Sequence, residues 1–146
     1  IASLPYVLGV TTVIFGKHID KIQVDKAKNI HTLPVVIGEK AARYAVIAMM
    51  VLPYFFTGYL IVTKFFTPIM LIVLLAIPAL RESLPPLTKP KPDTRPEGFP
   101  DGQGGWPLYF APIAFRNNRS FGSLFMLGLL LDVALRLLPF TQNFWR

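Results

Sequence analysis

The sequence predicts an all-α protein, a polytopic bundle of transmembrane helices, from three observations. Hydrophobic residues make up 53% of the 146 residues, and charged residues make up only 16%, against about 25% in an ordinary globular protein. The charged residues are also absent from long stretches, so the apolar residues are concentrated in blocks. Blocks of about 20 uncharged residues match the thickness of a bilayer core. We therefore expect about four membrane helices, and we expect residues 1–146 to be a single membrane domain.

Two of these blocks lie in the first half of the chain. Residues 1–16 carry no charge and would cover about 24 Å as a helix, which is typical of the end of a membrane helix. Residues 44–63 are also uncharged and long enough to cross the hydrocarbon core. Residues 17–43, between the two blocks, are rich in charge and are expected to form an aspartate-containing loop outside the membrane. Because the chain begins at Ile1 inside an apolar segment, we expect it to be a fragment of a longer protein.

The other two blocks are residues 65–80 and 121–138. Lys64 alone separates the first of them from the preceding block, so the two helices are expected to form a hairpin. The last block is apolar except for Asp132 and Arg136. These residues are four positions apart, on one face of a helix, where they can pair and lower the cost of a charge at membrane depth.

Residues 81–120 form a second polar stretch, which is rich in proline and glycine. Such a composition is typical of a segment with little regular structure. The simplest interpretation is a linker outside the membrane. The alternative is a lid or docking surface, because Trp106, Tyr109 and Phe110 are suited to the membrane interface.

The distribution of basic residues predicts the topology. Four crossings place residues 17–43 and 81–120 on the same side, which then carries every lysine and arginine except Lys64, Arg136 and Arg146. By the positive-inside rule both loops are cytoplasmic, and we expect an integral protein of the cell inner membrane. The net charge of +7 then favours contact with anionic lipids of the bilayer. No groove-reading motif is present, so nucleic-acid binding is not expected.

The candidate site lies in residues 17–43, where acids and bases alternate. Taken alone, this pattern is typical of a solvated loop that balances its own charge. The functional alternative is a site in which carboxylates hold Mg²⁺ while lysine and histidine neutralise a phosphate ester. Composition leaves both interpretations open. The carboxylates are Asp20 and Asp25, and the basic residues are Lys21, Lys26, Lys28 and His31.

Residues 25–40, DKAKNIHTLPVVIGEK, resemble the second aspartate-rich motif of the UbiA superfamily of intramembrane prenyltransferases. In that family an aspartate-containing loop runs into a Thr-Leu-Pro-Val-like stretch, a glycine and the next membrane helix. The family motif lies between the sixth and seventh of nine helices. The resemblance would therefore cover the C-terminal part of a nine-helix UbiA-like fold and nearly all of this chain.

Two features depart from the family pattern. The usual spacing is DxxxD, which places the first acid at Lys21, whereas the acid of this chain is Asp20, five residues before Asp25. On a regular helix two such residues diverge by about 140°, so they can share an ion only if the segment is irregular. The first aspartate-rich motif of the family is not found in these residues.

The resemblance implies a prenyltransferase, which moves an isoprenyl group from a prenyl diphosphate to a lipophilic, aromatic acceptor with Mg²⁺ assisting the departure of diphosphate. It implies Asp20 and Asp25 as the catalytic metal ligands, and it leaves the neighbouring bases as diphosphate contacts: Lys21, Lys26, Lys28 and His31. The alternative is a degenerate relative or a non-catalytic scaffold subunit with partners in a membrane complex, which Lys21 at the acid position favours. A third interpretation is that the chain is a fragment of a transporter, which only Asp132, Arg136 and the prolines support.

Overall fold

The computed structural model describes residues 1–102 and 105–138, and over these residues the protein is all-helical without a β-strand. The all-α prediction is therefore confirmed for the described part of the chain. The elements in chain order are α1 (Leu4–Asp20), α2 (Ile22–Ala27), α3 (Leu33–Ile37), α4 (Glu39–Val62), η1 (Pro68–Ala76), α5 (Ile77–Thr88) and α6 (Phe110–Leu137). The 3₁₀ helix η1 continues directly into α5, so the two form one continuous helical segment.

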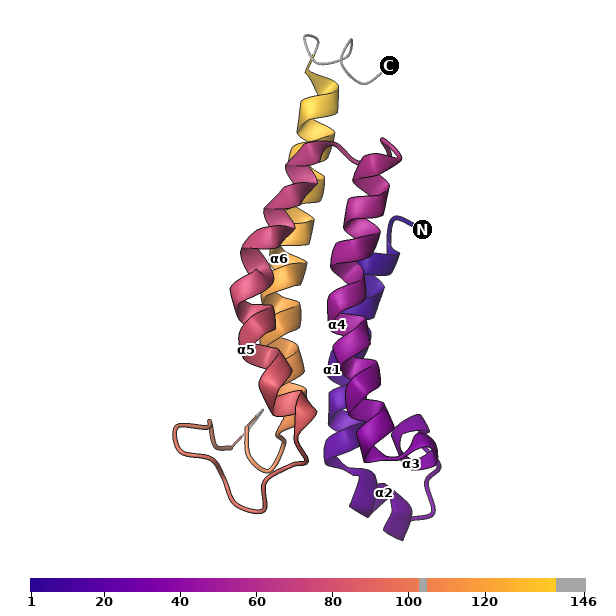
Figure 1. Ribbon diagram of the computed structural model, residues 1–146, viewed down its shortest axis with the longest axis vertical. Coiled ribbons are helices and arrows are strands. Elements are labelled where there is room, and N and C mark those ends of the chain that lie inside the picture. The colour runs from indigo at the N-terminus through magenta and orange to yellow at the C-terminus, as the bar shows by residue number, and fades with distance from the viewer. Residues whose placement is uncertain (103–104, 139–146) are drawn as a thin grey trace.

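The long helices run side by side along the length of the molecule (Figure 1). Helix α1 packs against α4 and α6, and α6 also packs against η1 and α5. The short helices α2 and α3 lie at one end of the bundle together with the loop of residues 89–109, and the turn between α4 and η1 lies at the other end (Figure 1). The two polar segments of the sequence therefore lie at the same end of the bundle.

Within the described residues, three helices are long and apolar enough to cross a membrane: Glu39–Val62, the continuous Pro68–Thr88 and Phe110–Leu137. The shortest of them has 21 residues, nine of which are 3₁₀-helical, and reaches about 36 Å, enough to cross a hydrocarbon core of about 30 Å. Helix α1 has 17 residues and reaches about 25 Å. Three of the four expected crossings thus have the required length and composition, and a crossing by α1 stays a prediction.

Residues 17–43 are largely helical, which differs from the expected loop. Helix α1 continues through the charged residues to Asp20, and α4 begins at Glu39 rather than at Tyr44. Lysine, glutamate and alanine are good helix formers, so these helices extend past the end of the apolar blocks. The only irregular parts of the segment are the short connections around α2 and α3.

The second polar segment is also shorter than expected. Helix α5 runs on to Thr88, and α6 begins at Phe110 rather than at Phe121. Among the described residues of 81–120, the irregular part is therefore only residues 89–102 and 105–109. Pro85 and Pro86 lack the N–H groups that would bond the carbonyls of Arg81 and Glu82, and α5 ends at Thr88, two residues after the second proline.

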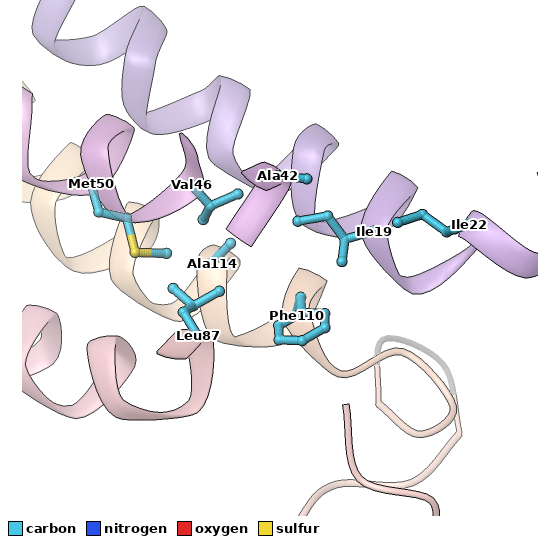
Figure 2. Close-up of a cluster of buried hydrophobic side chains, with 8 residues drawn as sticks. All are labelled: Ile19, Ile22, Ala42, Val46, Met50, Leu87, Phe110 and Ala114. Carbon is cyan, nitrogen blue, oxygen red and sulfur yellow. The ribbon is translucent and has the colours of Figure 1, made fainter. Parts of the chain in front are cut away.

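A buried apolar cluster joins the helices at the polar end of the bundle (Figure 2). It brings side chains of α1 and α2 against side chains of α4, α5 and α6. This packing positions the charged segment that follows α1 relative to the start of α6. The cluster consists of Ile19, Ile22, Ala42, Val46, Met50, Leu87, Phe110 and Ala114.

At the opposite end, Asp132 ties α6 to the turn between α4 and η1. Its carboxylate, in a residue only 5% exposed, accepts hydrogen bonds from the Thr67 backbone N–H at 2.6 Å and from Arg136 Nε at 2.9 Å. Arg136 also donates to the Phe65 carbonyl at 2.6 Å. The expected Asp132–Arg136 pair is thus present, and it additionally supplies partners for backbone groups of the turn.

The contact between α1 and α6 predicts the effect of a methyl group at Gly16. A Cβ atom there would lie 2.9 Å from the Phe110 carbonyl oxygen and 3.0 Å from the Ala111 nitrogen, and neither backbone atom can rotate away. We expect Gly16→Ala to push the helices apart and to cost about 1–3 kcal/mol. The measurement is the thermal unfolding midpoint of the purified protein in detergent.

Gly58→Ala is the matched control for this substitution. Gly58 is also within a helix, but a Cβ atom there meets nothing within 4 Å, so alanine should gain up to about 1 kcal/mol of helix propensity. Its unfolding midpoint should equal or exceed that of the wild type. An unchanged midpoint for Gly16→Ala would contradict the close approach of α1 and α6.

Candidate functional site

The two predicted acidic ligands, Asp20 and Asp25, belong to different helices. Helix α1 ends at Asp20, because Lys21 leaves the helical conformation with φ −106° and ψ 6°, and α2 begins directly after it. The irregular connection between the two aspartates is thus present. Each carboxylate nevertheless has its own set of partners, so the structure does not bring them together on a shared group.

Asp20 caps the N-terminus of α6. Its Oδ1 accepts hydrogen bonds from the backbone N–H groups of Tyr109 at 2.9 Å and Phe110 at 3.1 Å, and its Oδ2 accepts one from Ala111 at 3.0 Å. These groups belong to the first turn of α6, where N–H groups have no partner within the helix. The partial positive charge of a helix N-terminus also favours a carboxylate. Asp20 therefore joins the end of α1 to the start of α6.

Opposing effects act on the protonation of Asp20. Burial raises the pKa of this carboxyl above its ordinary value, because an ionised group loses hydration. The three backbone hydrogen bonds and the nearby Lys91 ammonium lower the pKa and offset part of this effect. The net direction is upward, so the folded protein holds the proton more tightly than the unfolded chain does.

Asp25 lies in α2, after the non-helical residue Lys21 that separates α2 from α1. The residue is 8% exposed. Its Oδ2 accepts a long hydrogen bond of 3.4 Å from the Thr32 hydroxyl and lies 3.7 Å from His18 Nδ1. The His18 Nδ1 atom is buried and makes no hydrogen bond within the described residues. Asp25 thus has weaker protein partners than Asp20, and it retains more capacity to bind a cation.

The turn after α2 brings Thr32 to Asp25. Asn29 adopts a positive φ of 55°, while the Ile30 N–H donates to the Asp25 carbonyl and the Asn29 N–H donates to the Lys26 carbonyl. This pair of bonds is a Schellman motif, which ends a helix and reverses the chain. The motif explains why a buried acid and a threonine seven residues later meet.

The rest of the Thr-Leu-Pro-Val-like stretch shapes the entry into α4. Pro34 is buried in the first turn of α3, where its missing N–H costs nothing. Gly38 joins α3 to α4 with φ 83° and ψ 157°, a conformation that favours glycine. These residues therefore position the loop, whereas Thr32 contacts the candidate ligand directly.

The predicted diphosphate contacts lie on the surface around Asp25. All of them are exposed, and none forms an ion pair with a carboxylate in the described ranges. The positive charges of the three lysines are therefore free to meet an anion. Both the solvated-loop interpretation and the functional interpretation require this exposure. The residues are Lys21, Lys26, Lys28 and His31.

The donor set at Asp25 limits the kind of metal site. No group of three or more His, Cys, Asp or Glu side chains could hold a metal ion within residues 1–102 and 105–138. Mg²⁺, however, normally keeps several waters and binds one or two carboxylates together with phosphate oxygens of a substrate. The donors at Asp25 therefore fit Mg²⁺ that is shared with a phosphate, and they do not fit a site made by this chain alone.

Sequence reasoning missed the role of the start of α6. The backbone of Tyr109, Phe110 and Ala111 lay inside the expected loop, yet it binds Asp20. One sequence signal was available, because Pro112 is typical of the first turn of a helix. The partner of that turn could not be read, since Asp20 is separated from Ala111 by 91 positions.

Neither aspartate lines a described cavity. One cavity of about 210 Å³ opens between α5, the loop and α6 and is lined by Glu82, Ser83, Pro96, Tyr109 and Arg116, among others. Glu82 and Arg116 form an ion pair at its rim. This cavity comes close to Asp20, because the Tyr109 N–H donates to the Asp20 carboxylate, whereas the other predicted site residues do not line it.

The capping role of Asp20 predicts a graded loss of stability. Asp20→Ala removes the acceptor of three N–H groups and should cost about 1–3 kcal/mol. Asp20→Asn keeps one carbonyl oxygen and should lose less. The thermal unfolding midpoints of both variants in detergent check this order. Equal midpoints for Asp20→Ala and the wild type would contradict the cap.

The raised pKa of Asp20 also predicts a pH dependence. The folded state binds this proton more tightly than the unfolded state, so ionisation of Asp20 removes stability. The unfolding free energy of the wild type minus that of Asp20→Asn should therefore fall as the pH rises from below 3.8, the ordinary value, to above the raised pKa. If the wild type instead gained stability relative to Asp20→Asn over this range, the hydrogen bonds to the carboxylate would outweigh the effect of burial.

Comparison of the chain with protein-family models, curated proteins and solved structures finds no match. The resemblance of residues 25–40 to the second aspartate-rich motif of the UbiA superfamily therefore stands on that motif alone. The observations that bear on function are the geometry of Asp25, the basic residues of its segment and the membrane-length helices beside it.

Proposed function

We propose that the protein is the C-terminal part of a UbiA-like prenyltransferase, which transfers an isoprenyl group from a prenyl diphosphate to a lipophilic, aromatic acceptor. The observation that carries the proposal is the position of Asp25. A carboxylate in a residue only 8% exposed lies at the polar end of a bundle of membrane-length helices, in a segment whose exposed lysines form no ion pair within the described residues. A substrate with an apolar chain and a diphosphate head needs these two environments side by side.

Asp25 is the proposed Mg²⁺ ligand. Its Oδ2 has only a long hydrogen bond from Thr32 and the buried His18 Nδ1 near it, so its lone pairs are available to a cation. When bound, Mg²⁺ supplies positive charge beside the leaving diphosphate. The Thr32 hydroxyl, at 3.4 Å, is the side chain that donates a hydrogen bond to this carboxylate within the described residues.

The basic side chains around Asp25 are proposed to bind the diphosphate. Negative charge accumulates on the diphosphate as its bond to the isoprenyl carbon breaks, and ammonium groups placed in advance stabilise that charge. These side chains are exposed and have no carboxylate partner in the described ranges. Lys21, at the position where the family has an acid, adds to this charge. The contacts are Lys21, Lys26, Lys28 and His31.

Asp20 takes a positioning role in this proposal. Three backbone N–H groups of α6 already occupy its two oxygens, which leaves little capacity for a metal ion. Its contribution is to hold α6 and the end of the 89–109 loop against α1, next to the site. Among the two aspartates first expected as ligands, Asp25 thus becomes the metal ligand and Asp20 the anchor.

The proposed reaction takes place at the cytoplasmic side of the cell inner membrane. The polar end of the bundle carries both basic segments, which the positive-inside rule assigns to the cytoplasm. The diphosphate would then meet Asp25 from the aqueous side. The isoprenyl chain and the acceptor would lie along the apolar helices.

A scaffold role is the second candidate. Within the described residues no cluster of three metal-ligating side chains exists, and Asp20 is committed to the N-terminus of α6. A non-catalytic subunit or a degenerate UbiA relative would keep these structural contacts and bind partner subunits in the membrane.

The test is Mg²⁺-dependent release of diphosphate from an isoprenyl diphosphate by the purified protein in lipid. We expect Asp25→Asn, which keeps the shape of the side chain, to lower the rate by about 100-fold or more, the usual effect of losing one electrostatic group. Removal of Mg²⁺ with a chelator should abolish release. Asp93→Asn is the control, because Asp93 is exposed in the loop and should leave the rate unchanged.

Two results would contradict the assignment. Full activity of Asp25→Asn in a working enzyme would show that the carboxylate is no metal ligand. A folded wild-type protein that releases no diphosphate from prenyl diphosphates of any length, and that co-purifies with other membrane subunits, would favour the scaffold role.

A further inference from the structure

Helix α3 turns an apolar face to the outside of the bundle. Leu33, Val36 and Ile37 are spaced i, i+3 and i+4, which places them on one face of a helix. Their exposed fractions are 55%, 66% and 41%. Pro34 of the same helix is buried. A helix this short would normally turn its apolar face inward, so the exposed face requires a partner.

The position of α3 places this face at the level of a bilayer surface. Gly38 alone separates α3 from α4, and α4 has 24 residues. At about 1.5 Å per residue α4 reaches about 36 Å, somewhat more than a hydrocarbon core of about 30 Å. The first turn of α4 therefore lies among the lipid headgroups, and α3, at the end of the bundle (Figure 1), lies beside it.

The charges around this face are positive. Lys26, Lys28 and Lys40 are exposed and make no ion pair in the part of the chain that the structure describes. The nearby acids are already engaged, because Glu39 lies 3.4 Å from Arg43 Nε and Asp25 is buried. An apolar face bordered by unpaired lysines is typical of a helix that lies in the interface of an anionic membrane.

We propose that α3 is an interfacial anchor that inserts Leu33, Val36 and Ile37 between the headgroups of an anionic bilayer, with Lys26, Lys28 and Lys40 on the lipid phosphates. The anchor fixes the plane of the membrane relative to the turn that holds Asp25. Lys26 and Lys28 are also proposed diphosphate contacts, whereas Val36 and Lys40 have no part in the proposed site, so variants at these two positions test the anchor separately from the enzymatic activity.

The absence of cysteine from the sequence makes a direct test simple. Val36→Cys introduces a single thiol, which is labelled with an environment-sensitive fluorophore in protein reconstituted into vesicles of phosphatidylcholine and phosphatidylglycerol. We expect the probe to be quenched by lipids with a nitroxide near the top of the acyl chain and to be shielded from aqueous iodide. Gln23→Cys on α2 is the matched control, because Gln23 is exposed and polar, and its probe should show the opposite pattern.

The lysines are tested in the same vesicles. Lys40→Gln in the Val36→Cys protein should weaken the association of α3 with the anionic surface roughly fivefold, since one basic residue near such a surface contributes about 1 kcal/mol. The measured effect is weaker quenching of the Val36 probe by the nitroxide lipid. In vesicles of phosphatidylcholine alone this quenching should be weaker still. Equal quenching with and without phosphatidylglycerol would overturn the electrostatic part of the proposal.

Two other outcomes would overturn the anchor itself. Equal access of iodide to the Val36 and Gln23 probes would show that α3 faces water. A Val36 probe protected from both iodide and nitroxide lipid would show that another protein surface covers α3. Asp25→Asn should leave every one of these readings unchanged, which separates a failed anchor from a failed enzymatic proposal.

Discussion

The structure depends above all on the hydrogen bonds that the N-terminus of α6 donates to Asp20. A helix of 28 residues begins with backbone N–H groups that need acceptors, and the acceptor comes from the end of α1, about ninety residues earlier. The same contact determines where the 89–109 loop ends and lets the backbones of α1 and α6 meet at Gly16. Because this end of α1 also leads into α2, the cap positions the whole candidate site.

The cap also separates the roles of two aspartates that are equivalent in the sequence. Asp20 is saturated by backbone donors, whereas Asp25 has only Thr32 at 3.4 Å and His18 at 3.7 Å. The difference arises from local chain geometry. The chain leaves the helical conformation at Lys21, directly after Asp20, whose carboxylate binds α6. The Schellman turn at Asn29 brings Thr32 to the Asp25 carboxylate.

The two ends of the bundle differ in how their charged groups are paired. A chain in a bilayer must pair every polar group that lies near the hydrocarbon core. At the turn between α4 and η1, the opposite charges of Asp132 and Arg136 pair with each other and satisfy the backbone of Thr67 and Phe65. At the other end Lys21, Lys26 and Lys28 form no ion pair within the described residues, so their charges can meet phosphate, whether of a substrate or of a lipid.

The sequence by itself determined the all-helical class, the apolar helices and the pairing of Asp132 with Arg136, because hydropathy and helical spacing are local properties. The position of the basic segments at one end followed from counting reversals of the chain. Only the tertiary structure decided that α6 begins at Phe110, that Asp20 is its cap and that α3 exposes Leu33, Val36 and Ile37. These features depend on which residues meet across long separations, and a periodic pattern holds no information about the partner that a carboxylate or an apolar face will find.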